Sequence, residues 1–252
     1  MNTSEIKSSC QELVTLTSSW PSFTGLRIMM MPIVSCDVRT FPECIHPYQN
    51  LLIEAMSLFP QHIGKVVYVT IDEADLKQGQ THRRPGLHVD GIYRSTTNIS
   101  GFGGSWGGGG GSWGGGSSVS SVTKLHEEAN GMILFANAPG CDAWASEQNF
   151  NTFDFDNEGG AEHLRERITE KDGRFERMSL KPNVAYWLNP FCIHESMPAS
   201  KDQLRHLIRI SLPNNCPWFK GYTKNPLGVK PTGEILSERK EFMSWKRTLK
   251  TS

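Results

Sequence analysis

Short apolar runs rich in β-branched and aromatic residues divide this chain into predicted strands. The clearest run is Val-Val-Tyr-Val-Thr-Ile-Asp at residues 66–72. Runs of this kind, bounded by Gly, Pro or Asn, are typical of β-strands. The same pattern predicts strands at residues 26–34, through His88, and at 131–138, 141–144, 175–180, 183–188 and 204–212.

Helical spacing of apolar residues is found in only a few segments. Residues 47–58 have it and end just before Pro60, so we expect a helix that packs on the outside of a sheet. Residues 162–168 predict a short amphipathic helix. A weak helical pattern at 6–16 and a polar, helical tail at 234–249 complete the set.

The order of these elements predicts the fold class. Strands do not alternate regularly with helices, and no Gly-x-Gly-x-x-Gly follows a strand, which excludes a dinucleotide-binding fold. Seven or eight strands with helices early and late predict a mainly β protein with flanking helices. A double-stranded β-helix (jelly-roll or cupin-like) core fits that count. We expect one domain over residues 1–252, with its core at about 26–220 and a polar C-terminal tail at 234–252.

A glycine-rich insert interrupts the predicted core at residues 101–118. The heptapeptide Gly-Gly-Ser-Trp-Gly-Gly-Gly at 103–109 is repeated without change at 110–116. Because such a run cannot offset the entropy lost on ordering, we expect it to be flexible. It follows the His88 strand and would reach a site there as a lid, but an expanded repeat with no role is the favoured interpretation.

Composition and charge limit the cellular locations and the classes of binding partner that we expect for this protein. The chain has 26 Lys and Arg against 26 Asp and Glu, which argues against a broad electrostatic grip on nucleic acid. No apolar run is long enough for a membrane span, and the N-terminus has no secretory pattern. The 6 cysteines are scattered, without Cys-x-x-Cys. We therefore expect an intracellular, cytoplasmic protein with reduced cysteines.

The strongest chemical signal is a His-x-Asp motif at His88 and Asp90. Residues two apart on a strand point to the same face, so an imidazole nitrogen and a carboxylate oxygen would meet at one point. His194 is the best candidate for a third ligand from later in the chain. Two His and one carboxylate form the facial triad of non-haem Fe(II) oxygenases, which leaves open coordination positions.

A candidate anion anchor follows at Arg209 and Ser211. The two residues share one face of the predicted strand at 204–212, between apolar neighbours. A guanidinium in such a run favours a partner anion, and its planar fork suits a carboxylate. Arg205, on the same strand, is a rival for this role.

The ordered set of His-x-Asp, distant His and Arg-x-Ser resembles the Fe(II)/2-oxoglutarate-dependent dioxygenases over about residues 64–212. The resemblance implies that His88, Asp90 and His194 bind Fe(II), and that Arg209 and Ser211 hold the distal carboxylate of 2-oxoglutarate. It also implies O2 as co-substrate, succinate and CO2 as products, and ascorbate as a possible reductant of the iron.

Hydroxylation, or an oxidation that begins with it, is the expected reaction. Related halogenases have Ala or Gly at the position of Asp90, which makes room for chloride, whereas here the carboxylate is present. Desaturation and ring formation remain compatible with the motif. The alternatives are a metal-binding cupin-like protein without oxygenase activity, a Zn hydrolase with the same triad, and a scaffold that binds no metal.

The substrate is the least defined part of the prediction. A small metabolite is the favoured class. Nucleobase-oxidising dioxygenases share this order of motifs, and the basic run at 82–84 with Trp106 and Trp113 would suit a nucleic acid. The zero net charge weakens that alternative. The run at 82–84 is equally compatible with a solvated basic turn.

Overall fold

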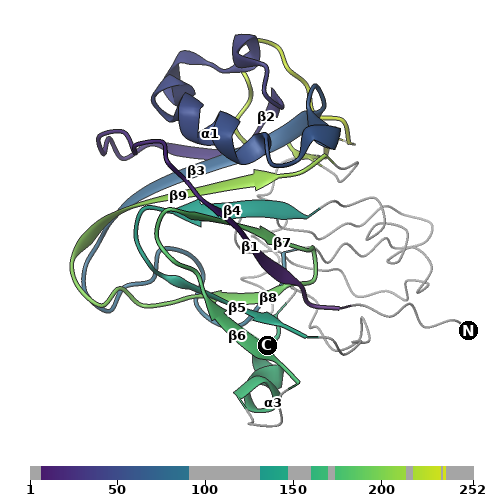
Figure 1. The fold of residues 1–252 in the computed structure, drawn as a ribbon. Helices are drawn as coiled ribbons and strands as arrows, with labels where there is room; N and C mark the ends of the chain where they lie inside the picture. Colours follow the sequence, from purple (N-terminus) through teal and green to yellow (C-terminus); the bar gives the residue numbers. More distant parts are fainter. Residues whose placement is uncertain are drawn as a thin grey trace, which may run out of the picture.

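Two antiparallel β-sheets make up most of the structure (Figure 1). The computed structural model describes residues 7–90, 131–146, 160–169, 174–213, 218–233 and 235–236. The larger sheet has the strand order β1-β7-β4-β9-β3-β2, and the smaller sheet has the order β6-β5-β8. The mainly β class predicted from the strand patterns is confirmed.

The larger sheet consists of β1 (Cys10–Thr15), β2 (Arg27–Val34), β3 (Val66–Leu76), β4 (Met132–Ala136), β7 (Val184–Leu188) and β9 (Gln203–Ser211). The smaller sheet consists of β5 (Cys141–Ala145), β6 (Glu176–Ser179) and β8 (Ile193–Ser196). Two short strands, β10 (Trp218–Phe219) and β11 (Ile235–Leu236), pair in parallel. The helices of the described residues are α1 (Gln49–Met56) and α3 (Arg165–Thr169), with 3-10 turns at Val38–Thr40, Glu43–Tyr48, Pro60–His62 and Glu162–Leu164.

The alternation of residues along β9 gives the larger sheet two different faces. His206, Ile208 and Ile210 point toward helix α1, whereas Arg205 and Arg209 point toward the smaller sheet. The α1 face is a continuous apolar core. Its buried members include Leu51, Leu52, Ala55 and Met56 of α1, Val67, Val69 and Ile71 of β3, and Ile133 and Phe135 of β4.

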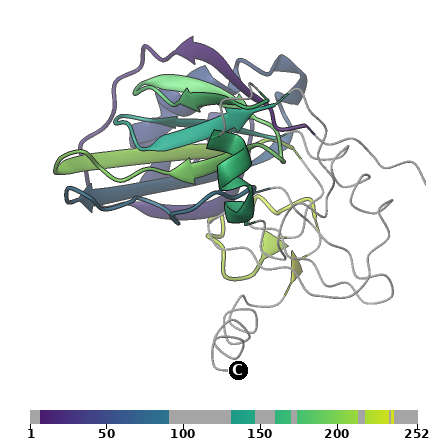
Figure 2. The same ribbon diagram turned by 90° about the horizontal axis from the view of Figure 1, so that it is seen from below.

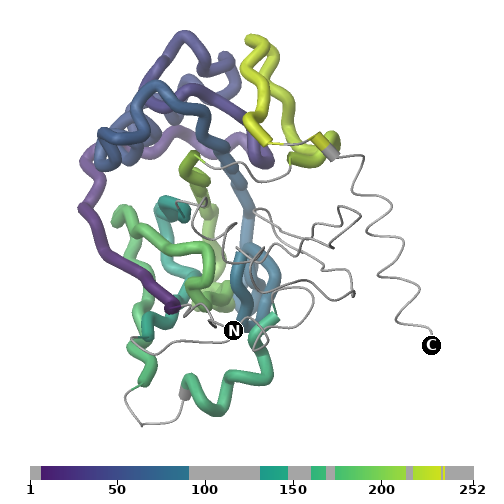
Figure 3. The backbone as a smooth tube through the Cα atoms, turned by 90° about the vertical axis from the view of Figure 1, so that its right-hand side faces the viewer, coloured from purple at the N-terminus to yellow at the C-terminus, as the bar shows by residue number. Residues whose placement is uncertain are grey.

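The space between the two sheets contains a second core, which surrounds the polar residues of the site. Its buried members include Tyr68, Met132, Leu134, Ala143, Tyr186, Leu188 and Leu207. Short helix α3 covers the outer side of the smaller sheet, where Leu164 and Ile168 pack with Trp144 and Ile193 (Figure 2). The C-terminal segment 218–233 returns to the α1 end, where Asn225 donates to the carbonyls of Pro32 and Thr40 at 2.8 Å each (Figure 3).

Most predicted strands are present within a residue or two of the expected ends, although β3 extends to Leu76. The helix predicted at 47–58 is present as α1 after a 3-10 turn, and the helix at 162–168 is present as a 3-10 turn followed by α3. The predicted strand through His88 is reduced to isolated bridges at His88 and Thr81.

The weak helical prediction for residues 6–16 is wrong, because Cys10–Thr15 form strand β1 at the edge of the larger sheet. Pairing with β7, from Cys10 with Leu188 to Thr15 with Val184, outweighs a marginal local preference. Of the predicted helical tail, Ile235 and Leu236 form β11 instead, and residues 237–252 lie outside the described residues. The insert at 101–118 also lies outside them.

Candidate metal centre

Backbone pairing between distant segments brings the two histidines together. The amide of His88 donates to the carbonyl of His194 at 3.0 Å, and the amide of His194 donates to the carbonyl of His88 at 2.9 Å. His194 is the second residue of β8, so the segment before Asp90 extends the smaller sheet at this point. Residues separated by more than 100 positions thus become direct neighbours.

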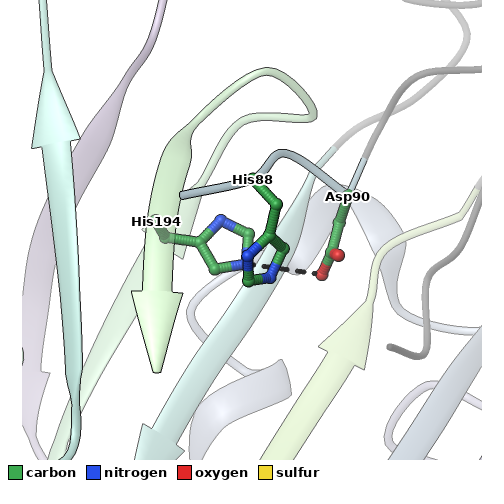
Figure 4. A group of neighbouring side chains, drawn as sticks. All are labelled: His88, Asp90 and His194. Carbon is green, nitrogen blue, oxygen red and sulfur yellow. Dashed lines mark ion pairs between the residues drawn. The ribbon is translucent and has the colours of Figure 1, made fainter. Parts of the chain in front are cut away.

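His88, Asp90 and His194 form one compact, buried group (Figure 4). One ligand atom from each residue lies within 4.8 Å of the other two. The Nε2 atom of His194 is 3.6 Å from Oδ2 of Asp90, and the two imidazole ring centroids are 4.4 Å apart. The structure therefore brings together all three residues that the sequence predicted as metal ligands.

Hydrogen bonds to backbone carbonyls orient both imidazole rings. Nδ1 of His88 is 2.7 Å from the carbonyl oxygen of Gly86, and Nδ1 of His194 is 2.9 Å from that of Cys192. A carbonyl only accepts, so each Nδ1 carries a proton, and Nε2 is the nitrogen that each ring directs toward the other ligands. This arrangement is typical of histidines that bind a metal through Nε2.

The charge states of the group suit a divalent cation. Burial, followed by the neighbouring His194, lowers the pKa of His88 to about 3, so this imidazole is neutral near pH 7. Burial raises the pKa of Asp90, but Arg209 and His194 outweigh that effect and hold it well below its ordinary value. Neutral imidazoles with an ionised carboxylate are the donor set of non-haem Fe(II) sites, and the residues present fit that ion.

Arg209 and Ser211, the predicted carboxylate anchor, have different surroundings. Nη1 of Arg209 is 2.7 Å from Oδ2 of Asp90, and Nη2 is 3.6 Å from the sulfur of Met30. The hydroxyl of Ser211 also lies 3.6 Å from the Met30 sulfur, and Ser211 is fully buried. Arg209 therefore lies at the centre, paired with a predicted ligand, while Ser211 packs against Met30.

Arg205 is the second guanidinium that β9 directs toward the centre. It is only 3% exposed, and its Nε donates to the carbonyl of Ala138 at 3.2 Å. No carboxylate of the described residues lies within 4.0 Å of it. Burial lowers the pKa of Arg205, although Cys141 and Asp72 act in the opposite direction. An anion bound beside this side chain would offset the cost of burying its charge.

A cavity that opens to solvent joins these groups. Its lining combines polar residues with the apolar side chains of Met132, Leu134 and Leu207. Its further lining residues are Thr70, Arg83, Arg84, His88, Asp90, Gly140, Cys141, His194, Ser196, Arg205 and Arg209. A small molecule bound there would contact the predicted ligands and both β9 arginines.

Glu162 supports the candidate centre from the neighbouring helical turn, and no local sequence pattern predicts this role. Its Oε2 accepts from the backbone amide of Leu87 at 3.0 Å, next to His88. Arg165 bridges Glu162 to Glu195, with Nη2 2.7 Å from Oε2 of Glu195, next to His194. The role of Glu162 depends on contacts across more than 70 residues of chain, which spacing alone does not reveal.

The chain was compared with protein-family models, with characterised proteins and with solved structures, and none of them matches. Within the part of the chain that the structure describes, no helix is both long enough and apolar enough to cross a membrane.

Proposed function

We propose that this protein is an Fe(II)- and 2-oxoglutarate-dependent oxygenase that hydroxylates or otherwise oxidises a C–H bond of a small organic substrate. The observation that carries the proposal is the buried group of His88, Asp90 and His194, with each Nδ1 tied to a carbonyl. Two oriented Nε2 atoms and one carboxylate oxygen border a cavity that has room for further ligands.

The path of the chain supports a jelly-roll core for this function. After β4 in the larger sheet, the chain crosses to β5 and β6 in the smaller sheet and returns through β7. It crosses again to β8 and returns to β9. Repeated crossing between two facing antiparallel sheets is the arrangement of jelly rolls, whose interiors hold ligands. In this chain β8 supplies His194 and β9 supplies both arginines.

Arg205 is the better candidate for the distal carboxylate of 2-oxoglutarate. Arg209 already pairs with Asp90, whereas Arg205 has no carboxylate within 4.0 Å among the described residues. A buried guanidinium offers two parallel hydrogen bonds to a carboxylate. In this scheme Arg209 keeps Asp90 ionised and correctly oriented, while Arg205 fixes the far end of the cosubstrate.

Fe(II), when bound with 2-oxoglutarate and O2, supplies the oxidative decarboxylation that yields succinate and CO2 and oxidises the substrate. The protein's own contribution is to position the reactants. His88, Asp90 and His194 would hold the metal on one side, and Arg205 would orient the cosubstrate. The apolar side chains of Met132, Leu134 and Leu207, which also line the cavity, would exclude water from it.

Anaerobic titration with Fe(II) and 2-oxoglutarate tests the proposal. The chelate has a weak visible charge-transfer band, which we expect in the wild-type protein. Arg205→Ala should lose the band at 2-oxoglutarate concentrations that saturate the wild type, and Arg39→Ala, at an exposed arginine far from the cavity, should keep it. If Arg209→Ala loses the band and Arg205→Ala keeps it, the residue that binds the distal carboxylate is Arg209 rather than Arg205.

Two other results would select a different class of protein. Iron binding without the band would favour a metal-binding cupin-like protein or a hydrolase that uses the same triad. Failure to bind iron would leave the two sheets as a scaffold without a metal centre. The nucleobase-oxidising alternative predicts the same band, and turnover assays on alkylated single-stranded DNA against small organic acids would separate it from a metabolite oxygenase.

A further inference from the structure

Arg84 is a cationic side chain at the mouth of the cavity that the proposed chemistry does not use. It lines the cavity of the metal centre, and it also lines a second, more open hollow bounded by Thr81, Leu87 and Pro198. Ser196 is likewise shared by both. Arg84 therefore lies where a molecule entering from solvent would pass toward His88.

The other arginines around these two hollows have carboxylate partners or a proposed one. Arg83 pairs with Asp72, Arg209 with Asp90, and Arg165 with Glu195. Arg205 is assigned above to the distal carboxylate of 2-oxoglutarate. Arg84 is half-buried and has no carboxylate within 4.0 Å in the described ranges.

The backbone holds Arg84 in a defined position. Pro85 follows it, which restricts Arg84 to extended conformations. On the other side, the amide of Arg83 donates to the hydroxyl of Ser196 at 3.1 Å. Gly86 has φ +87°, and a Cβ there would lie 3.3 Å from Oε2 of Glu162. Arg84 is thus presented from a constrained segment, which reduces the entropy lost when it binds a ligand.

Charge balance indicates what Arg84 would bind. With Fe(II), the 2-oxoglutarate dianion and Asp90 in place, the centre carries one net negative charge. Arg84, Arg205 and Arg209 together carry three positive charges along the same cavity. The balance is therefore about two net positive charges, and one of them, on Arg84, lies at the mouth rather than beside the cosubstrate, which favours an anionic second molecule.

We propose that the substrate is a small organic anion whose carboxylate, sulfonate or phosphate group binds Arg84, with its reacting C–H bond over His88, Asp90 and His194. This inference rests on the proposed oxygenase function and adds the substrate class. A nucleic acid is disfavoured as the source of the anion, because a phosphate backbone needs several cations in a row and the chain has no net positive charge.

The test uses the full-length protein loaded with Zn(II), which does not support turnover, and saturated with 2-oxoglutarate. Binding of hexanoate and of its neutral isostere hexanamide is followed by NMR, with the Nε cross-peak of Arg84 assigned from the Arg84→Gln spectrum. We expect hexanoate to bind about tenfold more tightly than hexanamide and to shift that peak, as for a charge-assisted hydrogen bond. Arg84→Gln should remove the preference, Arg84→Lys should keep part of it, and Arg39→Gln should leave it intact.

The outcomes separate this inference from the function on which it rests. Calorimetry first measures whether the Zn(II)-loaded protein takes up 2-oxoglutarate. If it does, but the protein binds hexanoate and hexanamide equally, only the anionic-substrate inference is overturned. A preference that survives in Arg84→Gln overturns that inference as well. If a hexathymidine oligonucleotide binds more tightly than hexanoate and shifts the same Arg84 peak, the substrate is a nucleic acid rather than a small anion. A sample that takes up Zn(II) but no 2-oxoglutarate overturns the proposed function itself.

Discussion

At the scale of single residues, hydrogen bonds around the candidate ligands decide what they can do. His88 and His194 each use Nδ1 on a backbone carbonyl, so only Nε2 is free to bind a metal. The sequence predicted that His88 and Asp90 meet, because His-x-Asp spacing is a local property, and the order of the motifs along the chain pointed to His194 as the distant third ligand. It did not predict the pairing of Arg209 with Asp90 or of Ser211 with Met30, because these contacts depend on how β9 lies over the His88 segment and β2.

Replacing either histidine should remove metal binding without unfolding the protein. In His88→Ala and His194→Ala, one of three ligands is lost, and we expect affinity for Fe(II) to fall by more than about 100-fold, beyond the usual effect of changing a residue that only hydrogen-bonds to a ligand. His46→Ala, at an exposed histidine remote from the cavity, is the matched control. Anaerobic competition with a chromophoric chelator measures the affinity. Wild-type affinity in either ligand variant would exclude that residue from the centre.

The supporting contact from Glu162 gives a second prediction at this scale. Glu162→Gln keeps a carbonyl oxygen that can accept from Leu87, whereas Glu162→Ala leaves the amide next to His88 without this partner. Loss of such a support typically weakens metal binding by about 10–100-fold. We therefore expect Glu162→Ala to bind Fe(II) at least about tenfold more weakly and Glu162→Gln to stay close to wild type, by the same competition assay. Equal affinities in all three proteins would remove Glu162 from the supporting role.

At the scale of elements, β9 links the stability of the fold to the site. Ile208 and Ile210 belong to the core under α1, and Arg205 and Arg209, which have the opposite parity, reach the cavity. Alternation made this strand predictable from sequence. The edge strand β1 was not predictable, because its partner β7 lies more than 160 residues away and its own pattern favours a weak helix. Local patterns identify strands that carry a buried face, and they are weakest where a distant partner determines the structure.

The start of β4 provides a test of how strongly one backbone position constrains the larger sheet. Gly131 has φ +82°, and a Cβ there would lie 2.4 Å from the carbonyl oxygen of Leu188. Gly64 has a similar φ of +77° with nothing within 4 Å. Gly64→Ala should therefore cost only the conformational strain, about 1–2 kcal/mol, whereas Gly131→Ala must also displace backbone between β4 and β7. Urea unfolding should show a clearly larger loss for Gly131→Ala, and equal losses would mean that the close approach relaxes freely.

At the scale of the whole molecule, the segment before the candidate metal centre is fixed to both sheets. Asp72, on β3 of the larger sheet, pairs with Arg83 at 2.5 Å, and His82 lies 3.7 Å from the same carboxylate oxygen. The following residues pair with β8 of the smaller sheet through His88. Asp72 is 3% exposed, so its charge is well shielded from solvent. Arg83 and Arg84 both line the cavity, but Arg83 is paired with Asp72 of the larger sheet, whereas Arg84 has no carboxylate within 4.0 Å in the described ranges.

This connection should make stability depend on pH in a defined direction. Burial raises the pKa of Asp72, but His82 and Arg83 outweigh it and lower the pKa to about 2, from an ordinary value of 3.8. Because the folded protein prefers the ionised form, the stabilisation is complete above about pH 5 and is lost as the pH falls toward 2. The shift corresponds to about 2 kcal/mol at pH 5, of which about half should be lost at pH 3.

Urea unfolding of the wild type and of Asp72→Asn at pH 5 and pH 3 measures this contribution. The difference in the free energy of unfolding between the two proteins should be largest at pH 5 and should shrink at pH 3, because protonated Asp72 resembles Asn. Asp75→Asn, in an exposed pair with Lys77, should change the stability little at either pH. A difference that stays constant between the two pH values would show that Asp72 acts through packing or hydrogen bonds rather than through its charge, and that the link between the sheets is not electrostatic.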